Sequence, residues 1–203
     1  MSKLPLNIVW MKRDVRSQDH EPLQYAEASD LPYLIVYFFE PSIIAHPDTS
    51  TRHLKFIHQS IEQTNQVLAP FQKQIEPFYG EATDVFNFLT EKFTIQNVFS
   101  YQESGVQKTW DRDKSVKKLL DSKGINWTEF QRDGILRGIK NRKGWDKHWF
   151  VTMAEPAIKN EFKKSANIPL DHPFPIPEKL LAEWRQKTEG FQPGGELNAW
   201  KYL

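Results

Sequence analysis

Residues 34–39 read LIVYFF, an unbroken run of apolar side chains, β-branched and aromatic among them, that Glu40 and Pro41 bring to an end. An earlier apolar run, residues 6–10 (LNIVW), ends at the charged residues 12–14. Runs that do not alternate strictly with polar residues are typical of parallel strands that helices cover on both faces. These two stretches therefore predict an α/β protein built on a buried parallel sheet.

The rest of the first 130 residues alternates similar runs with amphipathic segments. We expect further strands at 75–79, around 98–99 and at 127–130, and helices over 22–28, 54–68, 82–93 and 110–123. This order favours a doubly wound, five-stranded parallel sheet with right-handed crossovers and helices on both faces, a Rossmann-like fold. The strand order that we expect is 3-2-1-4-5.

The character of the sequence changes after this α/β domain, which we assign to residues 1–131. Residues 132–165 read as a basic and helical extension, since the stretch from 132 to 148 holds six basic residues and only two acidic ones. Trp145, Trp149 and Met153 follow one another at helical spacing. We interpret this stripe as packing and the basic run as a solvated face, with contact to DNA phosphates as the alternative.

The remaining segments are assigned from composition and pattern. Residues 166–195, with five prolines and three glycines, read as a linker that a short helix around 178–186 interrupts. Residues 196–203 read as the beginning of another helix. We therefore expect the chain to be truncated at that point.

The composition excludes several classes of protein. The 203 residues contain no cysteine, which excludes disulfides, thiolate metal sites and cysteine nucleophiles. No apolar stretch has the length of a membrane span, so we expect a cytoplasmic protein without a membrane partner. The formal net charge of +1 provides no overall electrostatic reason to expect nucleic-acid binding.

Motifs of common catalytic and cofactor sites are absent. The nine glycines form neither the Gly-x-Gly-x-x-Gly dinucleotide motif nor the Gly-x-x-x-x-Gly-Lys-Ser/Thr phosphate loop. There is no Gly-x-Ser-x-Gly or His-Glu-x-x-His motif, and the six histidines are scattered. We expect neither a catalytic residue nor a metal site in this chain.

Three blocks of sequence resemble one known family. Residues 10–23 (WMKRDVRSQDHEPL) are similar to the opening W-F-R-R-D-L-R-x-x-D-N-x-x-L of photolyases and cryptochromes, with Lys12 as a like-charge replacement and His20 in place of asparagine. Residues 100–105 (SYQESG), followed by Arg112 and Asp113, resemble the Gln-Glu-Thr-Gly and Arg-Asp segment of cryptochrome-like members. Residues 191–196 (FQPGGE), with Ala199 and Leu203, resemble the Gly-Gly-Glu-x-x-Ala stretch that introduces the family's flavin domain.

The resemblance implies the amino-terminal α/β domain of a photolyase, which in this family houses an optional light-harvesting chromophore: a folate, a deazaflavin, a lumazine or a flavin. It also implies a further helical domain, which binds FAD and the DNA lesion and contains the electron-donating tryptophans. The parent protein is then a deoxyribodipyrimidine photo-lyase, an enzyme that flips bases out of the duplex. The chain alone is then not catalytic, and no oligomeric state is implied.

Topology places the candidate site independently of the resemblance. Ligands of open parallel sheets bind beyond the carboxyl ends of the strands, where the winding reverses. For the expected strand order, the residues at that point are Lys12, Arg13, Phe39, Glu40, Tyr101, Gln102 and Glu103. Aromatic faces for stacking and polar groups for the edge suit a planar chromophore, and an arginine can hold a phosphate tail.

Other interpretations remain open at this stage. Arg13, Asp14, Arg16 and Asp19 can instead form a structural ion-pair cluster in the first loop, with Trp10 in the core. The domain can be the scaffold of a signalling cryptochrome that holds no antenna pigment. A third candidate is an adenine-nucleotide-binding protein of the related open α/β group, although that reading lacks a glycine-rich phosphate loop.

Overall fold

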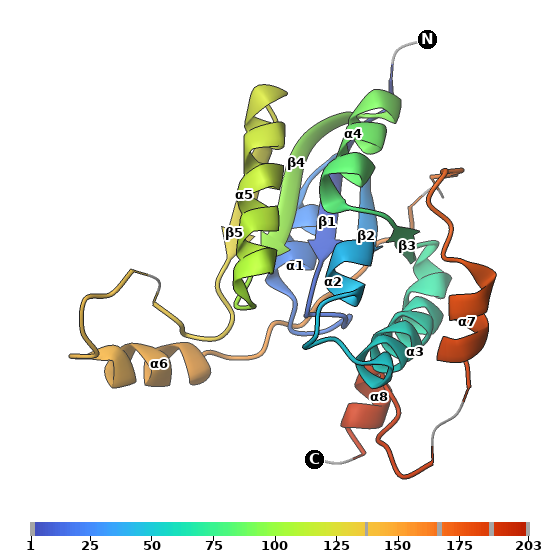
Figure 1. Cartoon of the computed structure of the whole chain (residues 1–203). Coiled ribbons are helices and arrows are strands. Elements are labelled where there is room, and N and C mark those ends of the chain that lie inside the picture. Colours follow the sequence, from blue (N-terminus) through green and yellow to red (C-terminus); the bar gives the residue numbers. More distant parts are fainter. Residues whose placement is uncertain (1–2, 137, 166–167, 187–188, 202–203) are drawn as a thin grey trace.

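Five parallel strands form a single sheet in the order β3-β2-β1-β4-β5, which confirms the predicted topology (Figure 1). The structure is a computed structural model and describes residues 3–136, 138–165, 168–186 and 189–201. The strands are β1 (Pro5–Met11), β2 (Tyr33–Phe39), β3 (Ile75–Tyr79), β4 (Thr94–Tyr101) and β5 (Asn126–Phe130). The winding reverses between β1 and β4, as it does in other sheets of this order.

Helices cover both faces of the sheet. They are α1 (Glu21–Ala28), α2 (Pro41–Ile44), α3 (Thr51–Leu68), α4 (Ala82–Lys92), α5 (Gln107–Ser122), α6 (Trp145–Met153), α7 (Glu178–Trp184) and α8 (Glu196–Ala199), with a 3-10 turn at Ala69–Phe71. Two side chains begin helices as N-caps: Ser50 accepts from the amide of His53 in α3, and His20 accepts from the amide of Leu23 in α1.

The core has one layer on each face of the sheet. Alternate residues of β1 belong to different layers. Ile8 and Trp10 pack under α4 and α5, whereas Val9 and Met11 pack under α1, α3 and α7. Trp10 is 1% exposed, which confirms its expected place in the core. The continuous apolar strands arise because both layers need apolar side chains.

Part of the segment that we expected to be a linker packs against the α/β domain. Ile176 and Trp184 are buried, and the Trp184 ring lies 4.7 Å from that of Phe39 at the end of β2. The amide of Tyr79 donates a 2.9 Å hydrogen bond to the carbonyl of Phe174, next to the edge of β3. Residues 166–167, 187–188 and 202–203, which belong to the expected linker and terminal helix, lie outside the described residues.

The Gly-Gly-Glu stretch docks the carboxyl end of the chain onto the domain. A side chain at Gly194 would place its Cβ 2.1 Å from the carbonyl oxygen of Phe56 on α3, so this position requires glycine. The Glu196 carboxylate accepts hydrogen bonds from the amide and hydroxyl of Ser17 and from the amide of Gln18, at 2.6–3.0 Å. The motif therefore fastens α8 to the loop that follows β1.

Replacing Glu196 by alanine is expected to loosen that loop. The two amides and the hydroxyl lose their acceptor, and leaving such partly buried donors unpaired costs about 1–3 kcal/mol. Hydrogen exchange at the amides of Ser17 and Gln18, measured by NMR, should accelerate by about tenfold or more. The variant Glu189→Ala, at an exposed position, is the matched control, and equal exchange in both variants would contradict the assignment.

Candidate functional site

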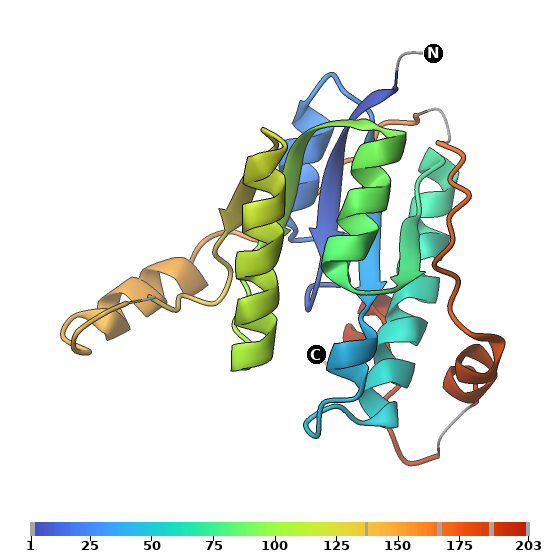
Figure 2. The same cartoon turned by 45° about the horizontal axis from the view of Figure 1, so that its top comes forward.

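A cavity of about 520 Å³ lies beyond the carboxyl ends of β1 and β2. Its walls come mainly from five parts of the chain: the strand ends at 10–13 and at 37–40, the segment 43–60 of α2 and α3, Glu103 after β4, and the start of α5 at 106–112. Figure 2 shows the strand arrows pointing toward α2 and the first turns of α3. The cavity therefore occupies the place that parallel sheets of this kind offer to ligands.

The strand ends supply an aromatic wall. Trp10, Tyr37, Phe38 and Phe39 line the cavity. The rings of Trp10 and Phe38 lie 5.4 Å apart, and those of Tyr37 and Phe39 lie 4.8 Å apart. Burial raises the pKa of Tyr37, so its hydroxyl stays protonated at neutral pH. These buried rings give the cavity an apolar base.

Arg112 of α5 lies between two buried carboxylates at the base of the cavity. Its Nη1 is 2.7 Å from Oε1 of Glu40, and its Nη2 is 2.8 Å from Oε2 of Glu103. Glu103 also accepts from Nε of Arg13 at 2.8 Å, and Glu40 accepts from the amide of Ala82 at the start of α4 at 3.2 Å. The guanidinium thus ties β2, α4 and the loop after β4 to α5.

Burial and charge act in opposite directions on these groups. Burial raises the pKa of Glu40, and the charge of Arg112 offsets the rise only in part. For Glu103 the burial effect is outweighed by Arg112 and then Arg13, so its pKa lies below the usual range. Burial also disfavours the charge of Arg112, but Glu40 and Asp113 outweigh it and raise the pKa of the guanidinium. Arg112 therefore remains charged, as its central position requires.

Lys12, just after the end of β1, is surrounded by acidic and aromatic side chains. Its Nζ is 3.1 Å from Oδ2 of Asp113 and 3.8 Å from Oε1 of Glu129. The same ammonium lies 4.8 Å from the centre of the Trp10 ring and 5.4 Å from that of Trp127. Lys12 lines the cavity, but its charge is already compensated.

The structure brings five of the seven predicted site residues to the cavity: Lys12, Arg13, Phe39, Glu40 and Glu103. Tyr101 and Gln102 are not among its lining residues. Tyr101 belongs to the core layer under α1, where its hydroxyl accepts a 2.9 Å hydrogen bond from the amide of Glu21.

Sequence reasoning missed two parts of the wall. Arg112 was noted only as part of a family block, and no site residue was expected from residues 43–60. The only signal for the second part is that α2 and α3 follow the carboxyl end of β2 directly. His46 and His53 come from that segment, and the side chain of Arg13 is 53% exposed, so charged or polar groups remain accessible on the cavity wall.

The first loop does not hold one shared ion-pair cluster. Arg13 pairs with Glu103, Arg16 pairs with Asp19 at 3.0 Å, and Asp14 contacts His20. Oδ2 of Asp14 lies 2.7 Å from Nε2 of His20, whose Nδ1 accepts from the amide of Leu23, so the ring donates to Asp14. This buried pair connects the loop after β1 to the start of α1.

The stability of the fold is expected to decrease in acid as Asp14 becomes protonated. Burial alone would raise the pKa of Asp14, but the contact with His20, the hydrogen bond from the Lys12 amide and the charge of Arg132 together outweigh it, so the pKa is lowered. A carboxylate with a lowered pKa contributes stability that is fully present above its unfolded-state value of about 3.9 and is lost as the pH falls through the folded-state pKa.

Urea unfolding measured between about pH 2 and pH 7 checks this expectation. Asp14→Asn preserves the side-chain shape and removes the titration, so the variant should lose less stability on acidification than the parent chain. Asp111→Asn is the control for an exposed carboxyl, because hydrogen bonds from Lys114 and Gln107 also lower the pKa of Asp111, whose side chain is 58% exposed. An unchanged pH dependence in Asp14→Asn would contradict the role assigned to the pair.

Among the described residues, no group of three or more histidine, aspartate or glutamate side chains is placed to hold a metal ion. Within the same residues, no helix has both the length and the apolar character needed to cross a membrane. The cavity combines buried rings, a compensated charge cluster and an accessible arginine.

Comparison with known proteins connects this geometry to one family. The family model described as DNA photolyase matches residues 7–152. The deoxyribodipyrimidine photo-lyase of Buchnera aphidicola is 27% identical over 187 residues, which are 87% of this chain and 37% of that protein. Cryptochrome DASH of Synechocystis is 25% identical over 126 residues, 60% of this chain and 26% of that protein. The chain thus spans well under half the length of these curated relatives.

Solved structures match the fold. A cryptochrome from Synechocystis superposes with a TM-score of 0.71 at 21% identity, over 88% of this chain and 41% of that one. An archaeal photolyase from Sulfolobus tokodaii, described as holding two FAD molecules with the implication of a novel light-harvesting cofactor, has a TM-score of 0.71 at 17% identity. That match covers 93% of this chain and 44% of the other. At these identities the likeness shows the α/β fold alone.

Proposed function

The chain belongs to the DNA photolyase family, and we propose that its cavity binds a light-harvesting chromophore. The observation that carries this proposal is the cavity of about 520 Å³ with aromatic walls at the carboxyl ends of β1 and β2. Its volume lies within the usual range of about 300–1,000 Å³ for small-molecule sites. A planar pigment such as a flavin, deazaflavin, lumazine or folate matches its shape and lining.

The lining residues would have different roles in binding the pigment. Phe56 of α3 lines the cavity and is 44% exposed, so its ring would offer stacking surface to the pigment's face, and Ile43 and Ile57 would add apolar contact. The Arg112 cluster holds the base of the cavity rigid. Arg13, with its exposed guanidinium, is placed to bind an anionic tail such as a phosphate. The bound pigment would absorb blue or near-ultraviolet light and pass the energy to a flavin.

The whole protein's activity is a further part of the proposal. The Buchnera relative is named a deoxyribodipyrimidine photo-lyase, and the Sulfolobus photolyase is described with two FAD molecules. By analogy, this chain would serve a light-dependent lyase that acts on DNA and carries FAD as its catalytic cofactor. The same domain without a pigment would be the scaffold of a signalling cryptochrome, and pigment binding distinguishes the two.

A variant that fills the cavity tests the proposal. Ile57 on α3 lines the cavity and is partly buried, so Ile57→Trp would occupy the pigment's space and leave the charge cluster in place. Titration with each pigment, followed by the change in its fluorescence, should give binding to the parent chain and a loss of about tenfold or more for the variant.

Lys118→Trp on an exposed position of α5 is the matched control, since it adds the same indole away from the cavity. Circular dichroism establishes that both variants are folded. If Ile57→Trp bound every pigment as tightly as the parent chain and the control, the cavity would not be the binding site.

A further inference from the structure

A basic and apolar arm projects from the domain far from the cavity wall of α3. It consists of the described residues of the stretch 134–155, including α6, and Figure 1 shows it extending sideways beyond β5. No described residue of this arm lines the cavity, so the proposed function gives its surface no role. The side chains of the arm belong to two kinds, apolar and cationic.

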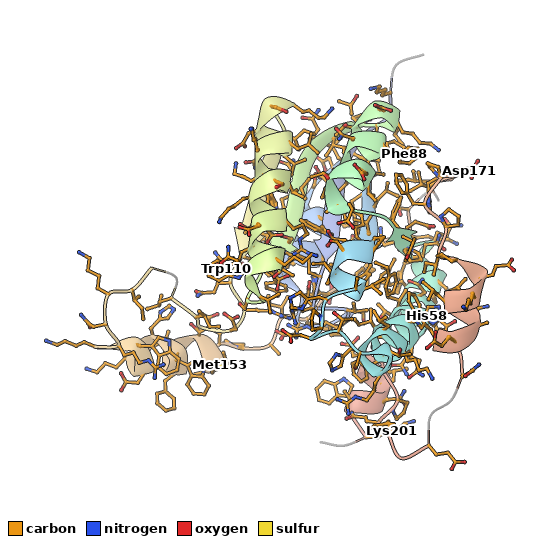
Figure 3. The ribbon with its side chains drawn as sticks, viewed as in Figure 1. His58, Phe88, Trp110, Met153, Asp171 and Lys201 are labelled. Atoms are coloured by element: carbon orange, nitrogen blue, oxygen red, sulfur yellow. The ribbon has the colours of Figure 1, made fainter. Side chains whose placement is uncertain are left out.

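The apolar side chains of the arm are exposed to an unusual degree. Phe150 is 64% exposed, Val151 65% and Met153 44%, and Ile135 and Ile139 in the preceding loop are 44% and 43% exposed. Figure 3 shows Met153 at the end of α6 that lies nearer the α/β domain. Exposed apolar residues that occur singly are ordinary, but a group of five on one short segment indicates a contact surface.

Three aromatic rings of α6 form a continuous series. Trp145 and Trp149 have ring centres 6.4 Å apart, and Trp149 and Phe150 have ring centres 5.2 Å apart in an edge-to-face arrangement. Trp149 packs on Gly134, whereas Phe150 presents its ring to solvent. The series therefore ends in an accessible aromatic face.

The cations of the arm lack acidic partners. Lys140, Arg142, Lys143 and Lys147 are exposed, and none of them has an ion pair in the part of the chain that the structure describes. Lys147 precedes Phe150 and Val151 by three and four residues, so cation and apolar side chains are neighbours on α6.

The acidic groups of the arm reduce this charge only in part. Asp133, just before it, accepts from the hydroxyl of Ser104 and the amide of Ile135, while Asp146 and Glu155 are exposed. In its described residues the arm therefore carries four cations without an ion pair and only two exposed carboxylates. Three of the four cations lie in the loop that leads into α6.

Charge complementarity identifies the kind of partner. Lysine is depleted at protein–protein interfaces, which makes a protein partner a poor match for this surface. A single-stranded nucleic acid offers phosphates to the cations and flat bases to the exposed rings, the combination that such binding sites use. We propose that the arm binds single-stranded DNA, with Phe150 stacking on a base and Lys140, Arg142, Lys143 and Lys147 contacting phosphates.

Fluorescence anisotropy with a labelled oligothymidine of about 16 nucleotides tests the proposal, since sites of this kind cover about 4–16 nucleotides. Phe150→Ala is expected to weaken binding by about fivefold or more, because stacking of one base contributes about 1–3 kcal/mol. The double variant Lys140→Gln/Lys143→Gln should lower the slope of log affinity against log salt by about 1.4, or about 0.7 for each lost phosphate contact.

The matched control is Lys118→Gln/Lys123→Gln, which removes two exposed lysines from the region of α5 and should leave the salt slope unchanged. All replaced side chains are exposed, and circular dichroism verifies the fold of each variant. A separate experiment measures sedimentation of the chain with vesicles of phosphatidylglycerol and phosphatidylcholine.

Several results would overturn the proposal. One is the absence of oligothymidine binding at low salt, and another is an equal loss of affinity in the control variant. Sedimentation with anionic vesicles without oligothymidine binding would identify a lipid surface as the partner. Binding of a blunt duplex that equals that of the single strand and is insensitive to Phe150→Ala would exclude base stacking. None of these results depends on whether the cavity binds a pigment.

Discussion

Replacing Arg112 by alanine is expected to lower the free energy of unfolding by about 3–5 kcal/mol. The guanidinium is 13% exposed and contacts Glu40 and Glu103, whose side chains are each 3% exposed. Its loss removes a close cationic partner from both buried carboxylates. Urea unfolding at neutral pH, followed by circular dichroism, measures the change.

A triple variant separates lost charge pairing from lost packing. Arg112→Met combined with Glu40→Gln and Glu103→Gln removes all three charges and retains most of the volume, so it should regain much of the stability. Acidification should also reduce the defect of Arg112→Ala, because the uncompensated carboxyls bind protons more readily in the folded state. A loss below about 1 kcal/mol for Arg112→Ala would show that the cluster contributes little.

Replacing Trp10 by alanine is expected to cost about 3–5 kcal/mol of unfolding free energy, the usual range for a buried tryptophan. The ring is 1% exposed and packs against Phe38, Phe86 and Trp127 at centre distances of 5.2–5.7 Å. Arg112 lies 4.9 Å from the centre of the same ring, so the substitution also removes a cation–π contact of the charge cluster.

The exposed position of Trp110 on α5 provides the control for this substitution. Its side chain is 41% exposed, and Trp110→Ala should change the unfolding free energy by less than about 1 kcal/mol. Circular dichroism is the appropriate signal, because both variants lose a fluorescent side chain. If Trp10→Ala unfolded at the same urea concentration as Trp110→Ala, the assignment of Trp10 to the core would fail.

Most of the fold was predictable because the strands carry their own signal. Residues 34–39 are apolar on both faces, since one face packs under α4 and α5 and the other under α3 and α7. The strand order followed from general rules for α/β sheets. The packing of residues 168–184 was not predictable from composition, because proline-rich sequence looks alike in a free linker and in a strap anchored by Trp184.

The candidate site was predictable in position and incomplete in detail. Parallel topology identified the edge of the sheet at which the cavity lies, but it does not say which face each terminal side chain takes. Tyr101 points to the layer under α1, while Glu103, two residues later and beyond the strand, reaches the cavity. Arg112 was missed because its role depends on Glu40, which lies 72 residues away in sequence, as well as on the nearer Glu103.

The absorption spectrum of the purified chain, after incubation with folate, deazaflavin, lumazine and flavin candidates in turn and removal of free pigment, tests the central claim most directly. We predict that one candidate is retained at one molecule per chain, and that its absorbance is lost from Ile57→Trp. A spectrum that shows tryptophan and tyrosine alone with every candidate would contradict the claim that the cavity binds a light-harvesting chromophore.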